Sequence, residues 1–338
     1  MAKLAKHYLL GVDLGGTKIL TGVFDAKLRL RGTAKVSTKA SRGVKAVVER
    51  VARCVHDALD ECDLSLAQVR AIGVGAPGAV DTRTGRVLFA PNLPDWKNIP
   101  LKRALEKLLA VPVFLGNDGN VCALGVYERE FKGRPNHLLG VFIGTGIGGG
   151  LVLNGELYCG HNLTAGEIGH MVIAVNGPKC GCGNRGCYEA LASRTAVFRR
   201  IQMAVKGGQK TLLTGLLGPD LRNLRSSHLR KAIRRGDKFV QKVIEETANY
   251  AGIGIANLIN ILNPDVVVVG GGLIEQLGDE MMPTLVRSAK EHVLPGTLRG
   301  IQIVASKLGD HAGITGAAVL ARRMSGQHPH ADHPPRRH

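Results

Sequence analysis

The feature that most constrains this chain is a glycine-rich turn that occurs twice, each time between two apolar segments. The first copy lies in "HYLLGVDLGGTKILTGVFD", with its turn at residues 13–18. The second lies in "HLLGVFIGTGIGGGLVLNGELY", with its turn at residues 144–150. Each copy has the pattern of a strand, a turn and a second strand. Two similar halves predict a duplicated α/β architecture with a cleft between the halves.

The rest of the chain supports an α/β fold. "GVKAVVERVARCVHDALDEC" has apolar residues at helical spacing, and "NPDVVVVGGGLIEQ" is typical of a buried strand that leads through glycines into a helix. With 338 residues, the chain is long enough for one large domain or two of ordinary size. Its 45 glycines and 4% aromatic residues suit buried parallel strands and tight turns.

Composition also argues against several classes of protein. No apolar run approaches the roughly 20 residues that span a bilayer. The N-terminus faintly resembles a signal peptide, but its apolar stretch is short and ends at Asp13 and a glycine turn. Seven cysteines, three of them clustered, favour reduced thiols and one metal site over disulfides. We therefore expect a cytoplasmic protein that does not act at a membrane.

The chain is strongly basic, with a formal net charge of +18. A basic balance can indicate nucleic acid, a membrane surface or a polyanionic substrate. The basic residues are dispersed, and no aromatic residues are interleaved with them as in single-strand binding surfaces. A solvated basic surface without nucleic acid is the expectation, and a highly negative donor or partner is the alternative.

The two glycine turns resemble known nucleotide motifs only in part. The first has the glycine separation of a P-loop, but Thr17 precedes Lys18, and a strand follows in place of a helix. The second, "GTGIGG", satisfies the dinucleotide fingerprint, yet a strand follows here too. Both turns expose backbone N–H groups that polyphosphate oxygens can approach. For either turn alone, an ordinary hairpin is the alternative.

A third turn, in "VVVVGGGL" at 267–273, joins a strand to a helix N-terminus and suits a bound nucleotide. Asp13 stands at a strand end beside the first turn, where it could hold Mg²⁺ directly or through water. The candidate nucleotide-binding residues are Asp13, Gly15, Gly16, Thr17, Lys18, Gly144, Thr145, Gly146, Gly148, Gly270, Gly271 and Gly272.

A metal site is predicted in "GHMVIAVNGPKCGCGNRGCYE", residues 169–189. Cys180, Cys182 and Cys187 with His170 make a Cys₃His set that fits tetrahedral Zn²⁺. Incidental buried cysteines are the alternative, and the C-x-C spacing disfavours a redox pair, which is usually C-x-x-C. Four protein ligands leave no open position for water, so we expect a structural zinc.

Taken in order, "DLGGTK", "GTGIGGG", "AGEIGH", "CGCGNRGC" and "GGG" resemble the ROK family of bacterial sugar kinases, over about residues 8 to 323. The resemblance implies an actin-like, hexokinase-type (ribonuclease H-like) duplicated two-domain fold and a homodimer. It implies ATP- and Mg²⁺-dependent phosphorylation of a hexose, most closely the 6-hydroxyl of D-glucose. Kinases for N-acetylglucosamine, N-acetylmannosamine, mannose or fructose are alternatives.

A non-catalytic sugar-sensing regulator is the alternative of a different class. The repressors of the family carry a winged-helix DNA-binding domain ahead of the first turn, whereas only 12 residues precede Asp13 here. We expect a small domain of residues 1–125 completed by about 311–323, and a large domain of 126–310 that contains the zinc knuckle at 170–187. Residues 324–338, rich in proline and histidine, are expected to be a disordered tail.

The resemblance also assigns the sugar site. Asp118, in "LGND", is implied as the carboxylate that takes the proton of the attacking hydroxyl. The alternative is that Asn117 or Asp118 simply caps the helix. His170 would bind zinc through one imidazole nitrogen and the sugar through the other. The implied sugar contacts are Gly78, Asn92, Asn117, Asp118, Glu167, His170 and Glu189.

Overall fold

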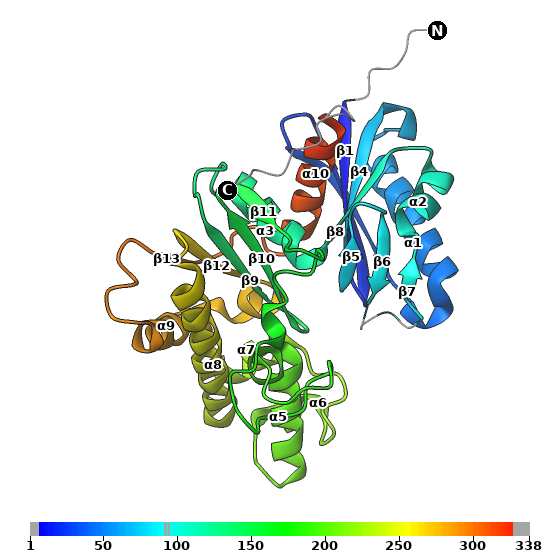
Figure 1. Cartoon of the computed structure of the whole chain (residues 1–338). Coiled ribbons are helices and arrows are strands. Elements are labelled where there is room, and N and C mark those ends of the chain that lie inside the picture. The colour runs from blue at the N-terminus through cyan, green and yellow to red at the C-terminus, as the bar shows by residue number, and fades with distance from the viewer. Residues whose placement is uncertain (1–6, 91–92, 94, 327–338) are drawn as a thin grey trace. The chain divides into compact units, whose positions relative to one another are not determined.

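The computed structural model describes residues 7–90, 93 and 95–326, and the chain divides into two compact units (Figure 1). The first unit comprises the described parts of Met1–Arg129, Gly160–Thr164 and His311–His338. The second comprises Glu130–Cys159 and Ala165–Asp310. The domain boundary expected near residue 125 falls inside the helix α3 (Asp118–Arg129), and nothing in the sequence pattern assigns Gly160–Thr164 to the first unit.

A mixed five-stranded sheet in the order β3-β2-β1-β4-β8 forms the centre of the first unit. β2 pairs antiparallel with both β1 and β3, whereas β4 runs parallel to β1 and β8. A small second sheet has the order β5-β6-β7. The strands are β1 (Tyr8–Leu14), β2 (Lys18–Phe24), β3 (Leu30–Ser37), β4 (Val69–Ala76), β5 (Ala79–Asp81), β6 (Arg86–Phe89), β7 (Lys97–Ile99) and β8 (Val113–Asn117).

Helices cover both faces of the first sheet, because its strands alternate their side chains between the faces. Leu10 and Val12 of β1 share a core with α1 (Gly43–Asp60) and α2 (Leu101–Leu109). Leu9 shares a second core with α10 (His311–Gly326). Because α10 continues to Gly326, the first three residues of the expected tail are helical, and residues 327–338 lie outside the described part. Two 3₁₀ helices, η1 (Ala40–Arg42) and η2 (Leu66–Gln68), complete this unit.

The sheet of the second unit repeats the first. Its order is β11-β10-β9-β12-β13, with β10 antiparallel to β9 and β11, and β12 parallel to β9 and β13. Position by position, β9, β10 and β12 correspond to β1, β2 and β4, so the predicted duplicated α/β fold is confirmed. The strands are β9 (Leu138–Ile143), β10 (Ile147–Leu153), β11 (Glu156–Tyr158), β12 (Val266–Gly270) and β13 (Gln302–Ala305).

Helices pack against this second sheet and extend beyond it. The longest, α8, begins after Asp237, whose carboxylate accepts hydrogen bonds from the backbone N–H groups of Val240 and Leu212 and so caps α8 and α6 together. No helix of the described residues is long and apolar enough to cross a membrane. The helices are η3 (Ile168–His170), α4 (Tyr188–Ala192), α5 (Arg194–Lys206), α6 (Leu212–Leu217), α7 (Ser226–Arg234), α8 (Lys238–Leu262) and α9 (Gly272–His292).

Candidate active site

The first glycine turn, residues 15–17, joins β1 to β2. Its shape is held by the backbone N–H of Gly15, which donates to the Lys18 carbonyl at 2.9 Å. Buried Thr38 braces it from outside, because its hydroxyl donates to the Gly15 carbonyl at 2.6 Å and its N–H to the Thr17 carbonyl at 2.9 Å. Within the described residues, the N–H groups of Gly16 and Thr17 have no hydrogen-bond partner. The turn therefore offers two donors to phosphate oxygens.

Asp13 ends β1 just before this turn, and its carboxylate lies against the start of α10. A Cβ atom placed on Gly313 would be 3.0 Å from the Asp13 carboxyl carbon, so nothing larger than glycine fits there without a shift. Mg²⁺ prefers hard oxygen ligands and is usually held by one or two carboxylates together with substrate phosphates. A single carboxylate beside a phosphate-binding turn fits that pattern.

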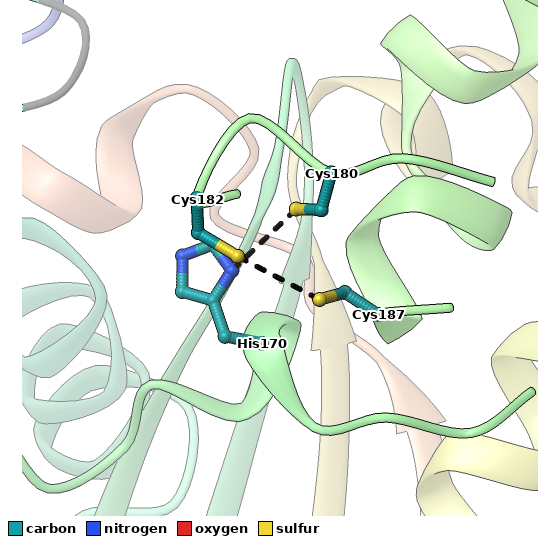
Figure 2. Close-up of side chains that lie close together, drawn as sticks. All are labelled: His170, Cys180, Cys182 and Cys187. Carbon is teal, nitrogen blue, oxygen red and sulfur yellow. Dashed lines mark hydrogen bonds between the residues drawn. The ribbon is translucent and has the colours of Figure 1, made fainter. Parts of the chain in front are cut away.

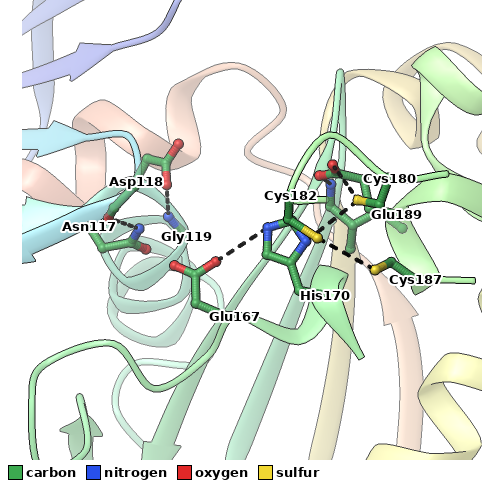
Figure 3. A network of polar contacts seen from close by, with 11 residues as sticks. Asn117, Asp118, Gly119, Glu167, His170, Cys180, Cys182, Cys187 and Glu189 are labelled. Carbon is green, nitrogen blue, oxygen red and sulfur yellow. Dashed lines mark hydrogen bonds and ion pairs between the residues drawn. The ribbon is translucent and has the colours of Figure 1, made fainter. Parts of the chain in front are cut away.

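Asn117 and Asp118 stand where β8 passes into α3. Asn117 caps the helix, because its Oδ1 accepts from the Asn120 N–H at 3.1 Å, while its Nδ2 donates to the Gly78 carbonyl at 3.0 Å (Figure 3). Asp118 is the first residue of the helix and accepts from the Gly119 N–H at 2.8 Å. The cap is therefore supplied by Asn117, and the Asp118 carboxylate lies at the positive end of the helix dipole.

The carboxylates of Asp13 and Asp118 both act on the thiol of Cys122. Cys122 lies one helical turn after Asp118, and burial together with the charges of Asp13 and Asp118 raises the pKa of this thiol. Asp13 and Asp118 thus influence a common region, although they are more than 100 residues apart in the chain. This region combines the candidate Mg²⁺ ligand with the candidate base.

The second turn, residues 144–146, repeats the design of the first. The Gly144 N–H donates to the Gly146 carbonyl at 2.9 Å, and the hydroxyl of Thr195 donates to the Thr145 carbonyl at 2.7 Å. Thr195 therefore braces this turn from α5 much as Thr38 braces the first, a role that no sequence pattern indicated. Gly148 lies inside β10, opposite Phe142, and not in the turn itself.

The third turn has the predicted order of strand, glycine turn and helix, with Gly270 ending β12 and Gly272 beginning α9. Gly271 has a φ of 89° and its Cβ position would be 2.7 Å from the Ile143 carbonyl, so only glycine is suitable. A cavity of about 650 Å³ opens beside this turn, which is within the usual size of a small-molecule site. Its lining includes Arg230, Gly270, Gly271, Ile274, Glu275 and Lys307.

The predicted metal ligands come together in the second unit (Figure 2). The ligand atoms of His170, Cys180, Cys182 and Cys187 all lie within 4.8 Å of one another. The Sγ atoms of Cys182 and Cys187 are 3.7 Å apart, and Cys180 Sγ is 3.8 Å from His170 Nδ1. A tetrahedron with Zn–S bonds of about 2.3 Å has an edge of about 3.8 Å. The set therefore fits Zn²⁺ with four protein ligands.

The acidic residues around this cluster belong to the candidate sugar site (Figure 3). His170 presents Nδ1 to the thiols and Nε2 to Glu167, whose Oε2 is 4.0 Å away. Burial raises the pKa of Glu167, and the nearby His170 opposes that shift. Glu189 accepts from the Ile147 N–H at 2.9 Å, at the start of β10, and Cys180 Sγ lies 3.9 Å from its other oxygen. Glu189 thus links the metal cluster to the second glycine turn.

The structure therefore places the predicted site residues in two groups. The first unit holds Gly78, Asn117 and Asp118 with the first turn, and the second unit holds the metal cluster, Glu167, Glu189 and the other two turns. Asn92, the remaining candidate sugar contact, lies outside the described residues.

A duplicated five-stranded sheet, with a glycine turn between the first two strands of each copy, is typical of the actin-like and hexokinase-type class of phosphotransferases. The chain belongs to the ROK family, whose sequence profile matches residues 9–324. A glucokinase of Thermotoga maritima is 35% identical over 326 residues, which cover 96% of this chain and 100% of that protein. An N-acetyl-D-glucosamine kinase of Salmonella paratyphi B is 32% identical and covers 92% of this chain and 98% of its own length.

Among solved structures, a ROK family glucokinase from Streptomyces griseus in complex with glucose and AMPPNP matches with a TM-score of 0.84 at 34% identity. The match covers 94% of this chain and 99% of that one. The predicted family and fold are therefore confirmed.

Proposed function

We propose that this chain is an ATP-dependent sugar kinase that phosphorylates D-glucose at its 6-hydroxyl, giving glucose 6-phosphate and ADP. The observation that carries the proposal is the similarity to a glucokinase over that protein's whole length. The geometry supports it, since each unit has a braced glycine turn with unpaired N–H donors and the first unit has a carboxylate at a helix N-terminus.

In the proposed reaction, Asp118 accepts the proton of the 6-hydroxyl while that oxygen forms a bond to the γ-phosphorus. The bond between the γ-phosphorus and the bridging oxygen breaks, and ADP leaves. Asn117 fixes the base by joining the first turn of α3 to the Gly78 carbonyl. Mg²⁺, held by Asp13 and the phosphates, would neutralise charge on the donor.

Zinc has a structural role in this proposal. With three thiolates and one imidazole, no coordination position remains for a reacting group. The metal would fix the ring of His170, leaving Nε2 for a sugar hydroxyl, and would hold Glu189 through its neighbour Cys180. The chemistry itself would occur at Asp118.

N-acetylglucosamine is the second candidate substrate, because a kinase for that sugar is 32% identical over nearly its whole length. The two sugars differ at position 2, so discrimination depends on the space beside that hydroxyl. We further propose a homodimer in the cytoplasm; the seven cysteines, none of them in a disulfide, are consistent with a reducing compartment. Light scattering during size-exclusion chromatography tests the dimer.

A coupled assay of ADP release on a panel of hexoses and N-acetylhexosamines tests the function. Glucose should give the highest kcat/KM. If N-acetylglucosamine gave the highest kcat/KM, it would replace glucose as the proposed substrate. Tight sugar binding without turnover of any sugar would indicate a sensor.

The same assay tests the base. Asp118→Asn should lower kcat by about 10²–10⁴-fold, because the amide cannot take the hydroxyl proton, with glucose affinity nearly unchanged in calorimetry. An Asp118→Asn variant with wild-type turnover would remove Asp118 from this role.

A further inference from the structure

The start of α5 is attached directly to the second glycine turn. The backbone N–H of Arg194 donates to the Gly144 carbonyl at 3.0 Å, and the Arg194 guanidinium donates to the Thr145 hydroxyl. Thr195 adds the hydroxyl contact to the Thr145 carbonyl. A cation that the sequence motifs do not contain is therefore fixed on the turn, some 50 residues further along the chain.

This turn also has unpaired donors. Among the residues that the structure describes, the N–H groups of Thr145 and Gly146 have no hydrogen-bond partner. The only bond within the turn is the one from the Gly144 N–H to the Gly146 carbonyl. Two N–H groups, a hydroxyl and a guanidinium thus gather at one exposed turn, and such a set suits a ligand with several acceptor oxygens.

The charge of Arg194 is not neutralised by a carboxylate within the described part of the chain, where no ion pair involves it. The Glu189 carboxylate, which reaches this turn from α4, is engaged by the Ile147 N–H. The neighbouring arginines behave differently. Arg199 donates to the carbonyls of Lys179 and Ala190, and Arg200 faces Glu246. Arg194 alone of these three presents its charge to the turn.

We propose that Arg194 is a phosphate-binding residue of the kinase reaction, which contacts the β- and γ-phosphate oxygens of the donor from the second unit. A planar guanidinium has five N–H donors, so the bond to Thr145 orients the group and leaves others for two phosphate oxygens. The partial positive charge at the start of the 13-residue helix α5 acts in the same direction. This inference rests on the proposed function.

During transfer, the bond from the γ-phosphorus to the bridging oxygen breaks and negative charge accumulates on the departing ADP. A fixed cation that contacts this region stabilises the charge as it develops, and removing one such donor typically lowers kcat by about 10²-fold or more. Arg194 transfers no proton in this reaction. The proton of the sugar 6-hydroxyl goes to Asp118, as proposed above. Its contribution is binding and charge stabilisation.

The test compares wild type with Arg194→Gln and Arg194→Lys. Arg194→Gln should lower kcat with glucose by on the order of 10²-fold and weaken AMPPNP binding in calorimetry about tenfold or more. Arg194→Lys should show smaller losses of kcat and of AMPPNP affinity than Arg194→Gln. Lysine retains the positive charge but lacks the planar guanidinium with its several N–H donors. Binding of adenosine, which has no phosphates, and of glucose should stay unchanged. Arg287→Gln, which removes an equally charged but ion-paired and exposed arginine from α9, should match wild type.

Unchanged kcat and AMPPNP affinity in Arg194→Gln would overturn the inference. So would equal losses of AMPPNP, adenosine and glucose binding, since these indicate a purely structural role for the contact with the turn. The proposed function fails separately, if wild type itself does not phosphorylate glucose. In that case AMPPNP and adenosine binding by the variants still decides whether Arg194 binds phosphate.

Discussion

At the scale of single residues, the site depends on groups that each make two contacts. Asn117 caps α3 and holds the Gly78 carbonyl. His170 faces the thiols with one nitrogen and Glu167 with the other. Glu189 binds the Ile147 N–H and lies beside Cys180. A residue held at two points loses little further freedom when the substrate binds, which favours tight and specific recognition.

Gly146 shows how little space surrounds one of these groups. A Cβ atom on Gly146 would lie 2.1 Å from Glu189 Oε2, whereas one on Gly144 would meet nothing within 4 Å. We predict that Gly146→Ala displaces the Glu189 carboxylate and weakens glucose binding about tenfold, measured by calorimetry. Gly144→Ala, two positions away in the same turn, should leave glucose affinity unchanged. Equal glucose affinity in both variants would mean that Glu189 does not contact the sugar.

At the scale of elements, the segment that contains the Cys₃His cluster and α5 are joined in one support for the candidate sugar site. Arg199 of α5 donates to the Lys179 carbonyl, next to the first thiol, and to the Ala190 carbonyl, next to Glu189. Isolated bridges between Lys179 and Arg185 and between Val172 and Cys187 close the segment on itself. Such a short segment has almost no apolar core of its own, so a bound metal would supply much of its stability.

Loss of the metal should therefore affect sugar binding more than chemistry. We predict that Cys182→Ser, or removal of zinc by a chelator, lowers zinc content and weakens glucose affinity about 10-fold to 100-fold, with a lower melting temperature. Readdition of Zn²⁺ to the chelated wild type should restore glucose affinity, and Mg²⁺ should not. Cys62→Ser, which alters a cysteine of the first unit, is the matched control. Full glucose affinity in protein shown by elemental analysis to lack zinc would contradict the structural role.

At the scale of the whole molecule, the sequence predicted the fold and family well, because the motifs occur in a fixed order and the three glycine turns adjoin the ends of β1, β9 and β12. The clustering of His170 with the three cysteines was predictable because these residues are close together in the chain. The braces Thr38 and Thr195 and the cation Arg194 were not, since their contacts with the turns are tertiary and follow no local pattern. The cap at Asn117 was left open between two adjacent residues, and only the hydrogen bond to Asn120 separates them.

The formal net charge of +18 is also a property of the whole molecule, because it attracts or repels a charged substrate at long range, before the substrate reaches its site. ATP with bound Mg²⁺ is an anion, whereas glucose is neutral. Between about 20 and 200 mM KCl the Debye length falls from about 20 to about 7 Å, which screens long-range attraction. We therefore predict that kcat/KM for ATP falls several-fold over this range in steady-state assays, while the KM for glucose stays constant. If the kinetic constants for ATP and for glucose worsened in parallel, salt would instead be acting on the fold. If kcat/KM for ATP did not change with salt, the basic surface would not attract the donor.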